Sequence, residues 1–460
     1  MKNLELLKSI SFGAPVAEDE ISDLANYFVQ TDQWDRIARG EIDIVRGDKG
    51  AGKSAIYSLL VTRTDQFFDQ RILLIPAERP RGATVFRDLT IDPPSSEQEF
   101  IGLWKLYIAV LIAEKLSDFE IKNDDARFAI NALQKEGLLE KPFDLAAIFH
   151  AVQSYAKSWF RPRGLEGGVT IDPNTGLTTA TFKITPSEPS ATEKKSGKVS
   201  IDEVLRRANK ALEEADFKVW VLLDRLDVAF AETHALQANA LRALLRVYRD
   251  LSDHEFVKLK IFLRSDIWRR ITDKGFREAS HITKFVVIEW SSSSLLNLIM
   301  RRLLKNEGVQ RDYSADPEKV LSNFSAQSTL FYKVFPAKVE QGSKKPSTFD
   351  WMVSRCADAT GKTAPREIVQ LLSALREQEI ARLQRGEATP SDDQLFDRSV
   401  FKAALPTVSE ARLTQNMYAE YPELRPFMEK LTKEKTEQTP ESLARAWSIS
   451  SEEAAEWAQN

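Results

Sequence analysis

The stretch from Glu41 to Leu60, EIDIVRGDKGAGKSAIYSLL, constrains the fold of this chain more than any other stretch. It begins with an apolar run typical of a buried strand, passes through a glycine-rich turn and continues as a helix. Residues 47–54, GDKGAGKS, match G-x-x-x-x-G-K-[ST], the pattern of a phosphate-binding loop. In such a loop the glycines let backbone N–H groups face phosphate oxygens, and the following helix adds the positive end of its dipole. The stretch therefore predicts a nucleoside triphosphate site.

Within this loop each residue type has an expected task. We expect the Lys53 ammonium to bridge the β- and γ-phosphates and the Ser54 hydroxyl to bind Mg²⁺. The residues expected to surround the phosphates of ATP are Gly47, Asp48, Lys49, Gly50, Ala51, Gly52, Lys53, Ser54 and Ala55.

A second stretch, KVWVLLDRLD at residues 218–227, has the pattern of the strand that carries a metal-binding acid in such proteins. The apolar run predicts a strand whose end directs Asp224 toward Mg²⁺. Arg225 occupies the position where many ATPases have a glutamate base. Asp227 is then a candidate for polarising the attacking water, although capping the next helix or pairing with a basic residue is an equally good interpretation.

Two arginines are further candidates for contacts with phosphate. Arg264 follows an expected strand at residues 257–263, where its planar fork could grip the γ-phosphate; the alternative is an ion pair with Asp266 or Asp224. Arg366 opens an expected helix in GKTAPREI, where it could reach the phosphates from a helical lid; the alternative is a surface arginine.

Composition limits the class of protein. The 460 residues are 43% hydrophobic and 29% charged, as in ordinary soluble globular proteins, and a net charge of −4 gives no reason to expect a nucleic-acid surface. Cys356 is the single cysteine and there are four histidines, which excludes a disulfide framework and the spacing of a zinc site. The longest apolar run, Leu106 to Ala113, is too short to cross a bilayer and favours a buried helix. We expect a cytoplasmic protein without a membrane segment.

The remaining pattern predicts an α/β domain with helical additions. We expect an amphipathic helix at 17–30, further strands at 71–76 and 285–288, a mobile linker at 187–200 and a hairpin around 168–184. In the helix at 238–251, three arginines on one face (Arg242, Arg246 and Arg249) indicate a solvated face or an arginine finger for a neighbouring subunit. The expected divisions are a lead-in and first part of the nucleotide domain at 1–96, a mostly helical insertion with a hairpin at 97–200, the second part at 201–290, a helical lid at 291–390, and a helical or winged-helix-like tail at 391–460.

Several of these segments together resemble a family of bacterial P-loop ATPases related to the STAND and AAA+ branches (KAP-like), which includes signalling and anti-phage defence ATPases. The segments are FGAPVAEDE, YFVQTDQW, VRGDKGAGKSAI, WKLYI, VLLDRLD, IFLRSDIW, IEWSSSSLL and TAPREI, and they span residues from about 11 to about 375. The resemblance implies an ASCE-type three-layer sandwich with strand order 5-1-4-3-2 and a helical lid.

The resemblance also implies roles for single residues. Lys53 and Ser54 correspond to the Walker A pair, Asp224 to the Walker B acid, Arg264 to sensor 1 and Arg366 to sensor 2. Arg225 departs from the glutamate of AAA+ proteins, which suits slow hydrolysis.

Three functions follow as hypotheses. The first is an ATP- and Mg²⁺-dependent switch or oligomerising regulator, in anti-phage defence, that forms a homo-oligomer or works with a separately encoded effector. The second is a DNA-stimulated AAA+-like ATPase, and the third is a catalytically weak nucleotide-binding scaffold. Guanine specificity and an ABC-type dimer are disfavoured because the sequence has no N-K-x-D and no LSGGQ-like element.

Overall fold

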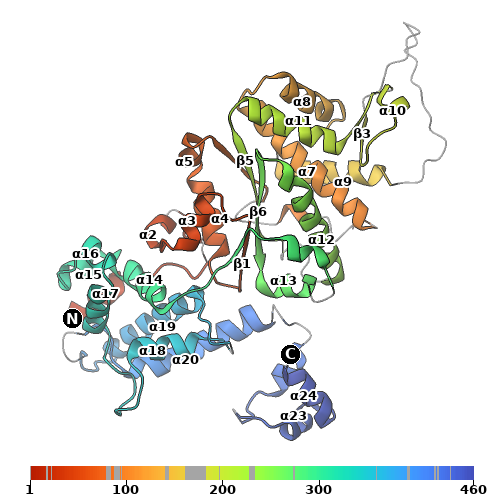
Figure 1. Ribbon diagram of the computed structural model, residues 1–460. Coiled ribbons are helices and arrows are strands. Elements are labelled where there is room, and N and C mark those ends of the chain that lie inside the picture. Colours follow the sequence, from red (N-terminus) through yellow and green to blue (C-terminus); the bar gives the residue numbers. More distant parts are fainter. Residues whose placement is uncertain are drawn as a thin grey trace. The chain divides into compact units, whose positions relative to one another are not determined.

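A parallel sheet of five strands is the centre of the computed structural model (Figure 1). Its strands are β1 (Ile44–Gly47), β2 (Ile72–Pro76), β5 (Lys218–Leu223), β6 (Val257–Arg264) and β7 (Phe285–Val287), arranged in the order β2-β5-β6-β1-β7. Counted along the chain they are the first to the fifth strand, so the order from the β7 edge is 5-1-4-3-2. The predicted α/β fold class and strand order are therefore confirmed.

The structure describes most of the chain, and the statements below concern those residues alone. They are 2–16, 19–21, 23–78, 84–87, 94, 96–139, 144–160, 183–195, 197–226, 234–272, 275–358, 360–390, 394–418, 421, 424–435 and 437–459. The chain divides into two compact units, one of residues 16–301 and one of residues 1–15 together with 302–460. Each unit is described by itself.

Helices cover both faces of the sheet because successive strand residues point to opposite sides and both sides are apolar. On one face Val45, Trp220 and Phe262 pack against helices that follow β1 or precede it. These helices are α3 (Asp32–Ala38), α4 (Lys53–Thr62) and α5 (Thr64–Asp69). The result is one outer layer of a three-layer sandwich (Figure 1).

The other face, with Ile44, Val221 and Ile261, packs against a larger helical layer. Its helices are α7 (Glu97–Asp118), α8 (Asp124–Lys135), α9 (Leu145–Ser158), α11 (Ile201–Glu214), α12 (His234–Asp250) and α13 (Ser265–Thr272), with short 3₁₀ turns η2 (Val85–Arg87), η4 (Leu251–Asp253) and η5 (Arg277–His281). Both faces of the sheet are thus buried, as an all-parallel sheet requires.

Helix α7 belongs to this core. The run from Leu106 to Ala113 is fully buried within it, which confirms the expected buried helix. Two polar groups of α7 reach backbone oxygens: the Trp104 indole donates to Ala240 at 2.9 Å, and the Tyr107 hydroxyl donates to Ala77 at 2.7 Å. Among the described residues, no helix has the length and apolar character needed to cross a bilayer.

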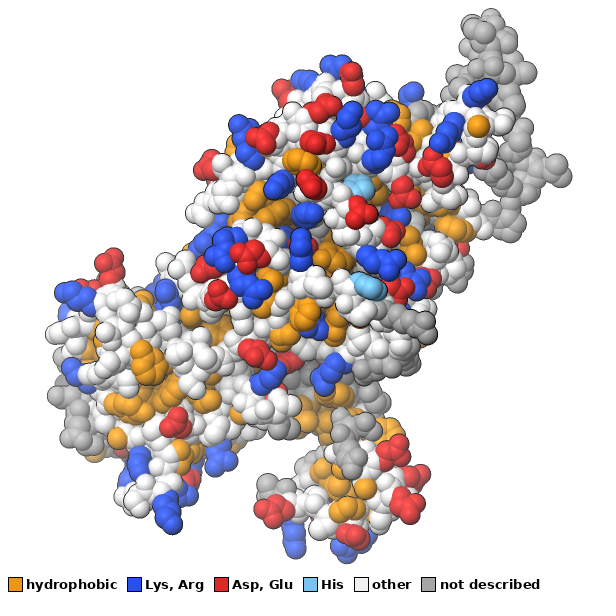
Figure 2. Space-filling view, in the orientation of Figure 1, with side chains coloured by type: hydrophobic (Ala, Val, Ile, Leu, Met, Phe, Trp, Pro, Cys, Tyr) orange, Lys and Arg blue, Asp and Glu red, His pale blue; other side chains and the backbone are white. Residues whose placement is uncertain are grey.

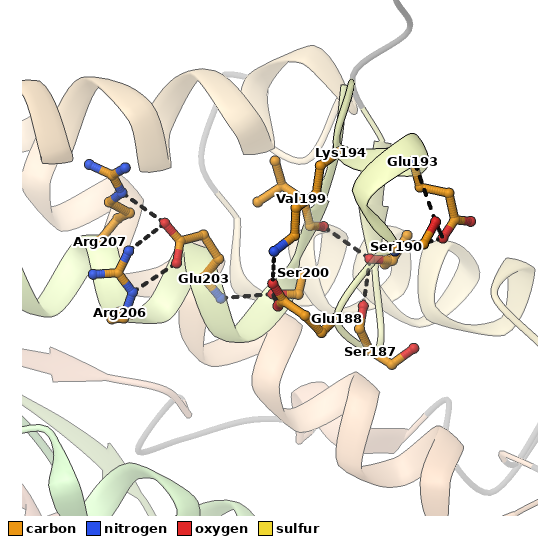
Figure 3. Close-up of polar contacts among 11 residues, drawn as sticks. Ser187, Glu188, Ser190, Glu193, Lys194, Val199, Ser200, Glu203, Arg206 and Arg207 are labelled. Carbon is orange, nitrogen blue, oxygen red and sulfur yellow. Dashed lines mark hydrogen bonds and ion pairs between the residues drawn. The ribbon is translucent and has the colours of Figure 1, made fainter. Parts of the chain in front are cut away.

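Residues 183–195 and 197–200 include two strands and a helix, so the mobile linker expected at 187–200 is wrong for its described residues. They form β3 (Lys183–Thr185), α10 (Ala191–Lys195) and β4 (Lys198–Ser200), with β3 and β4 paired in parallel. The Ser200 hydroxyl caps α11 by accepting from the Glu203 amide at 3.1 Å and donates to Glu188 at 2.8 Å (Figure 3). Low hydrophobicity misled the prediction because polar contacts hold this segment. The expected hairpin lies mostly outside the described residues.

The helix expected at 17–30 is also wrong in extent. The described part of this stretch holds only α2 (Leu24–Tyr27), and a separate helix, α3, follows. The Thr31 hydroxyl caps α3 by accepting from the Trp34 amide at 3.3 Å. Helix α2 ends where Phe28 adopts an extended conformation, and the cap residue Thr31 starts α3.

The described residues of the other compact unit form helices joined by loops, together with an isolated bridge between Ala357 and Thr363. Its helices are α1 (Lys2–Ser9), α15 (Glu307–Asp312), α16 (Pro317–Leu321), α17 (Phe324–Val334), α18 (Thr348–Cys356), α19 (Pro365–Gln384), α20 (Ser399–Ala411), the π-helix η6 (Arg412–Met417), α22 (Arg425–Lys430), α23 (Pro440–Trp447) and α24 (Ser451–Gln459); α14 (Ser292–Leu304) spans the division between the units. Arg376 ties α1 to α19 by donating to the carbonyl oxygens of Leu7 at 2.7 Å and Lys8 at 2.9 Å.

Helices α22, α23 and α24 share a small core of their own. Trp447 and Trp457 both pack on Phe427, and the Trp447 indole donates to the Phe427 carbonyl at 2.9 Å. The described residues of this tail hold helices and no strand.

Candidate nucleotide-binding site

The predicted phosphate-binding loop lies between β1 and α4, at the carboxyl end of a central strand. The Lys53 Nζ atom donates to two carbonyl oxygens of the loop, those of Gly47 at 2.8 Å and Asp48 at 3.0 Å. The side chain thus folds back over the loop from the first turn of α4. Its ammonium and the first amides of α4 bring positive charge to one small region.

The loop needs glycine at three positions. Gly50 and Gly52 have φ of 82° and 105°, in the left-handed region that side chains other than glycine rarely adopt. Gly47 is constrained by space, because a Cβ atom there would lie 3.2 Å from the Cβ of Ala51 and 3.3 Å from that of Ile288. The backbone therefore curls as the motif requires, which is the observation that fits a phosphate.

Trp290 braces this loop, a contact that sequence reasoning missed. Its indole nitrogen donates to the Ala51 carbonyl at 2.8 Å, and its ring lies 3.9 Å from the point where a Cβ of Gly52 would be. Trp290 comes just after β7, the neighbour of β1 in the sheet. The segment IEWSSSSLL contains it, but nothing in the sequence shows what the indole contacts.

Asp224 directly follows β5 and is buried, with 5% of its surface exposed. It lies close enough to α4 for its charge to act on Tyr57: burial raises the pKa of Tyr57, and the negative charge of Asp224 raises it further. Tyr57 lies one turn of α4 after Lys53 and Ser54. Asp224, the Walker B candidate, thus lies at the carboxyl end of the parallel strands, as the loop and the start of α4 do.

Glu78 is a second acid at this edge that sequence reasoning missed. The last paired residues of β2 and β5 are Pro76 and Leu222, so Glu78 and Asp224 each lie two positions beyond a matched pair. Glu78 is fully buried; its carboxylate accepts from the Thr84 hydroxyl at 2.5 Å, and its carbonyl accepts from the Tyr57 hydroxyl at 2.6 Å. The signal in the sequence that could have identified Glu78 is that a glutamate closely follows an expected strand.

Arg264 lies at the end of β6, level with Gly47 of β1 in the sheet. Its guanidinium makes a two-pronged ion pair with Asp266, at 3.0 Å from Nε and 2.9 Å from Nη2. One of the two interpretations, an ion pair with Asp266, is therefore present in this structure. Next to it, the buried Ser265 hydroxyl has no hydrogen-bond partner among the described residues.

Arg225, Asp227 and Arg366 also stood out in the sequence. Arg225 has φ of 58°, so the chain turns sharply after Asp224. Asp227 lies outside the described residues. Arg366 opens α19 as expected, in the other compact unit, and its contact with phosphate stays a prediction.

Two of the three arginines on the α12 face are paired within the chain, so the expectation of a solvated face is wrong for Arg242 and Arg246. Arg242 donates to the Ile271 carbonyl at 3.1 Å, and Arg246 pairs with Glu97 at 2.6 Å and Glu278 at 3.2 Å. Arg249 is exposed.

The sheet order and the loop between β1 and α4 define an α/β fold of the P-loop ATPase class. No protein-family model and no curated protein matches the sequence of this chain. Among solved structures, the chain is similar to the Aeropyrum pernix ORC2 protein, determined as ADPNP and ADP complexes, with 12% identity and a TM-score of 0.31. The match covers 81% of this chain and 65% of that chain, and a similarity this distant transfers no activity or residue role.

Proposed function

We propose that this chain is an ATPase that binds ATP with Mg²⁺ through residues 47–55 and hydrolyses it slowly. The observation that carries the proposal is the position of Lys53. Its ammonium is held over a glycine loop at the carboxyl end of β1, and the buried Asp224 follows β5 of the same parallel sheet. Ligands of open parallel sheets bind outside the carboxyl ends of the strands, so the site and the fold agree.

The loop supplies the contacts with phosphate. Its backbone amides face the phosphate oxygens, and the Lys53 ammonium neutralises charge between the β- and γ-phosphates. Ser54 and Asp224 hold Mg²⁺, which when bound offsets charge on the phosphate oxygens. On binding, the Lys53 ammonium exchanges its contacts with the neutral carbonyls of Gly47 and Asp48 for contacts with charged oxygens.

Slow hydrolysis follows from the residues around Asp224. Arg225 cannot take a proton from water, and Asp227 is the acid left nearby in the sequence to polarise it. Arg264 serves as sensor 1 after leaving Asp266, and Arg366 serves as sensor 2. A site of this kind suits a switch whose ATP-bound state persists.

As a regulator, the protein couples ATP binding to assembly. The helical unit acts as the lid, and the assembled form acts on a separately encoded effector in anti-phage defence. The support for this finer role is the resemblance of the motif set to signalling and defence ATPases and the presence of a separate, helical compact unit.

The test is ATP binding, phosphate release and particle mass measured on the full chain with ATP and Mg²⁺. Lys53→Ala should lower ATP affinity by at least about tenfold, since it removes a charge-assisted contact, and should abolish ATP-dependent assembly. Lys195→Ala is the matched control because this lysine is exposed on α10. Equal ATP affinity in the Lys53→Ala variant and the parent would refute the proposal.

One alternative has an observation in its favour. Arg225 in place of a glutamate also fits a nucleotide-binding scaffold without turnover. Phosphate release equal in the parent and in Lys53→Ala, with ATP binding retained in the parent, would favour the scaffold.

A further inference from the structure

A cleft of about 210 Å³ lies at the amino-terminal edge of the sheet, the edge opposite the phosphate-binding loop. It is lined by residues that come just before β1 and β7, by the first residues of β6 and by the last turn of α12. Strand β6 connects the two edges, with Val257 at the cleft and Arg264 level with Gly47. Seven residue steps separate these ends, roughly 23 Å of extended chain, so one small ligand cannot occupy both places.

Basic side chains from three different elements line the cleft. They are Arg249 of α12, Lys258 of β6 and Lys284 before β7. The hydroxyl-bearing Ser252 and Thr283 also line it. Three cations and two hydroxyl groups therefore meet in one concave place on a chain whose net charge is −4.

Asp43 is the one acid among the described lining residues, and its carboxylate is already engaged. The buried Lys260 ammonium lies 2.8 Å from its Oδ1 atom, and the Tyr248 hydroxyl donates to Oδ2 at 3.1 Å. The charge of Asp43 is thus balanced by Lys260, which lies beneath the cleft. The three cations Arg249, Lys258 and Lys284 still outnumber the other acids whose charges act on them, Glu278 on Arg249 and Glu255 on Lys258.

The lysines also repel one another. Burial lowers the pKa of Lys258, and the nearby charge of Lys284 lowers it further; Lys218 acts the same way, while Asp43 and Glu255 oppose them. The buried Lys260 has a lowered pKa for the same reasons: burial first, and then Lys284 and Lys258 against the attraction of Asp43. An anion placed between the lysines would relieve this repulsion.

The geometry points to this cleft as a second anion site, one that binds a phosphate group. A phosphate group can offer separate oxygens to Arg249, Lys258 and Lys284, which come from three different elements, and its negative charge offsets their surplus of positive charge. The phosphate comes either from a small phosphate-bearing molecule or from the backbone of a nucleic acid, since both carry the same group. The nucleotide site at the other edge is not involved.

The experiment uses the full chain with Lys53→Ala, which removes the main phosphate contact of the loop. Inorganic phosphate and a single-stranded DNA oligomer are tested separately by thermal unfolding and by titration, with chloride at matched ionic strength. Phosphate should raise the unfolding temperature progressively, with the logarithm of its concentration once the site is nearly saturated, because a ligand of the native state stabilises it. Adding Lys258→Met and Lys284→Met should weaken binding by about tenfold or more.

The results of these titrations show whether the basic residues of the cleft bind an anion or only contribute to the fold. Without phosphate, the Lys258→Met/Lys284→Met variant should unfold at nearly the temperature of the parent, because the relief of repulsion offsets the loss of the 3.0 Å hydrogen bond from Lys258 to the His254 carbonyl. The charge-matched control is Lys195→Met/Lys435→Met, which also removes two positive charges, both exposed. Binding of inorganic phosphate alone identifies a small ligand, and binding of the oligomer identifies a nucleic-acid backbone. No binding of either, or equal binding by the double variant, overturns the proposal and leaves the ATP site untouched.

Discussion

The indole nitrogen of Trp290 lies 2.8 Å from the carbonyl oxygen of Ala51, 239 residues away in the sequence. The contact joins the segment after β7 to the middle of the phosphate-binding loop. Lys53 also contacts this loop, by donating to the carbonyl oxygens of Gly47 and Asp48. The loop is therefore fixed by side chains as well as by its own backbone, which prepares it for a phosphate before one binds.

Trp290→Phe should weaken ATP binding by about three- to tenfold, the effect of losing one hydrogen bond that holds the loop. The change keeps an aromatic ring beside Gly52, so the unfolding temperature should change little. Nucleotide titration and thermal unfolding of the same samples check both expectations. Trp351→Phe is the control, because that buried indole nitrogen has no partner among the described residues. A larger effect of the control on ATP affinity would contradict the bracing role.

Gly52→Ala should impair the loop more than the fold. A Cβ at φ of 105° costs about 1–3 kcal/mol of backbone strain, which here falls where α4 begins and Lys53 is positioned. Gly275→Ala makes a matched control: φ is 81°, and a Cβ there meets nothing within 4 Å. Both variants should lose similar stability in urea unfolding, and Gly52→Ala alone should lose ATP affinity. Equal ATP affinity in the two variants would remove the special role of Gly52.

The sheet was predictable because its strands are short segments rich in Val, Ile, Leu and Phe. The loop was predictable because glycine, lysine and serine at fixed spacing serve one chemistry. Strands β2, β6 and β7 begin and end within one residue of the predicted 71–76, 257–263 and 285–288, and Asp224 follows β5 as predicted.

Contacts across the chain were not predictable. Trp290 and Glu78 meet the loop and α4 through hydrogen bonds to backbone oxygens, which leave no pattern in a sequence. The same is true of Arg246, whose partner Glu97 is far away along the chain. Helical spacing places an arginine on a face but does not reveal what packs on that face.

Lys260 and Asp43 form a buried ion pair, with 1% and 5% of their side chains exposed and a separation of 2.8 Å. Lys260→Met should destabilise the sheet unit by about 3 kcal/mol or more, because it leaves the Asp43 carboxylate buried with Tyr248 as its remaining described partner. Lys260→Met combined with Asp43→Asn should recover part of that loss, since no uncompensated charge remains. Urea unfolding of the parent and the three variants measures the coupling. Additive losses in the double variant would show that the two groups do not depend on each other.

Cys356, the single cysteine, should report on the opening of the helical unit. Burial raises the pKa of its thiol to about 12, with a further contribution from the charge of Glu367. At pH 8 the native thiol should therefore react slowly with a disulfide reagent and quickly once the chain is unfolded in urea.

The raised pKa of Cys356 also sets the sign of a pH effect. Between about pH 9, the ordinary value, and about pH 12, the native state keeps the thiol proton that the unfolded chain releases. The native state then binds more protons, so the free energy of unfolding falls as pH rises, by roughly 1 kcal/mol per pH unit in the middle of that range. Cys356→Ala should remove this part of the slope. Parallel pH curves for the parent and the variant would mean that the thiol is not held protonated, and hence that the α18–α19 region admits water.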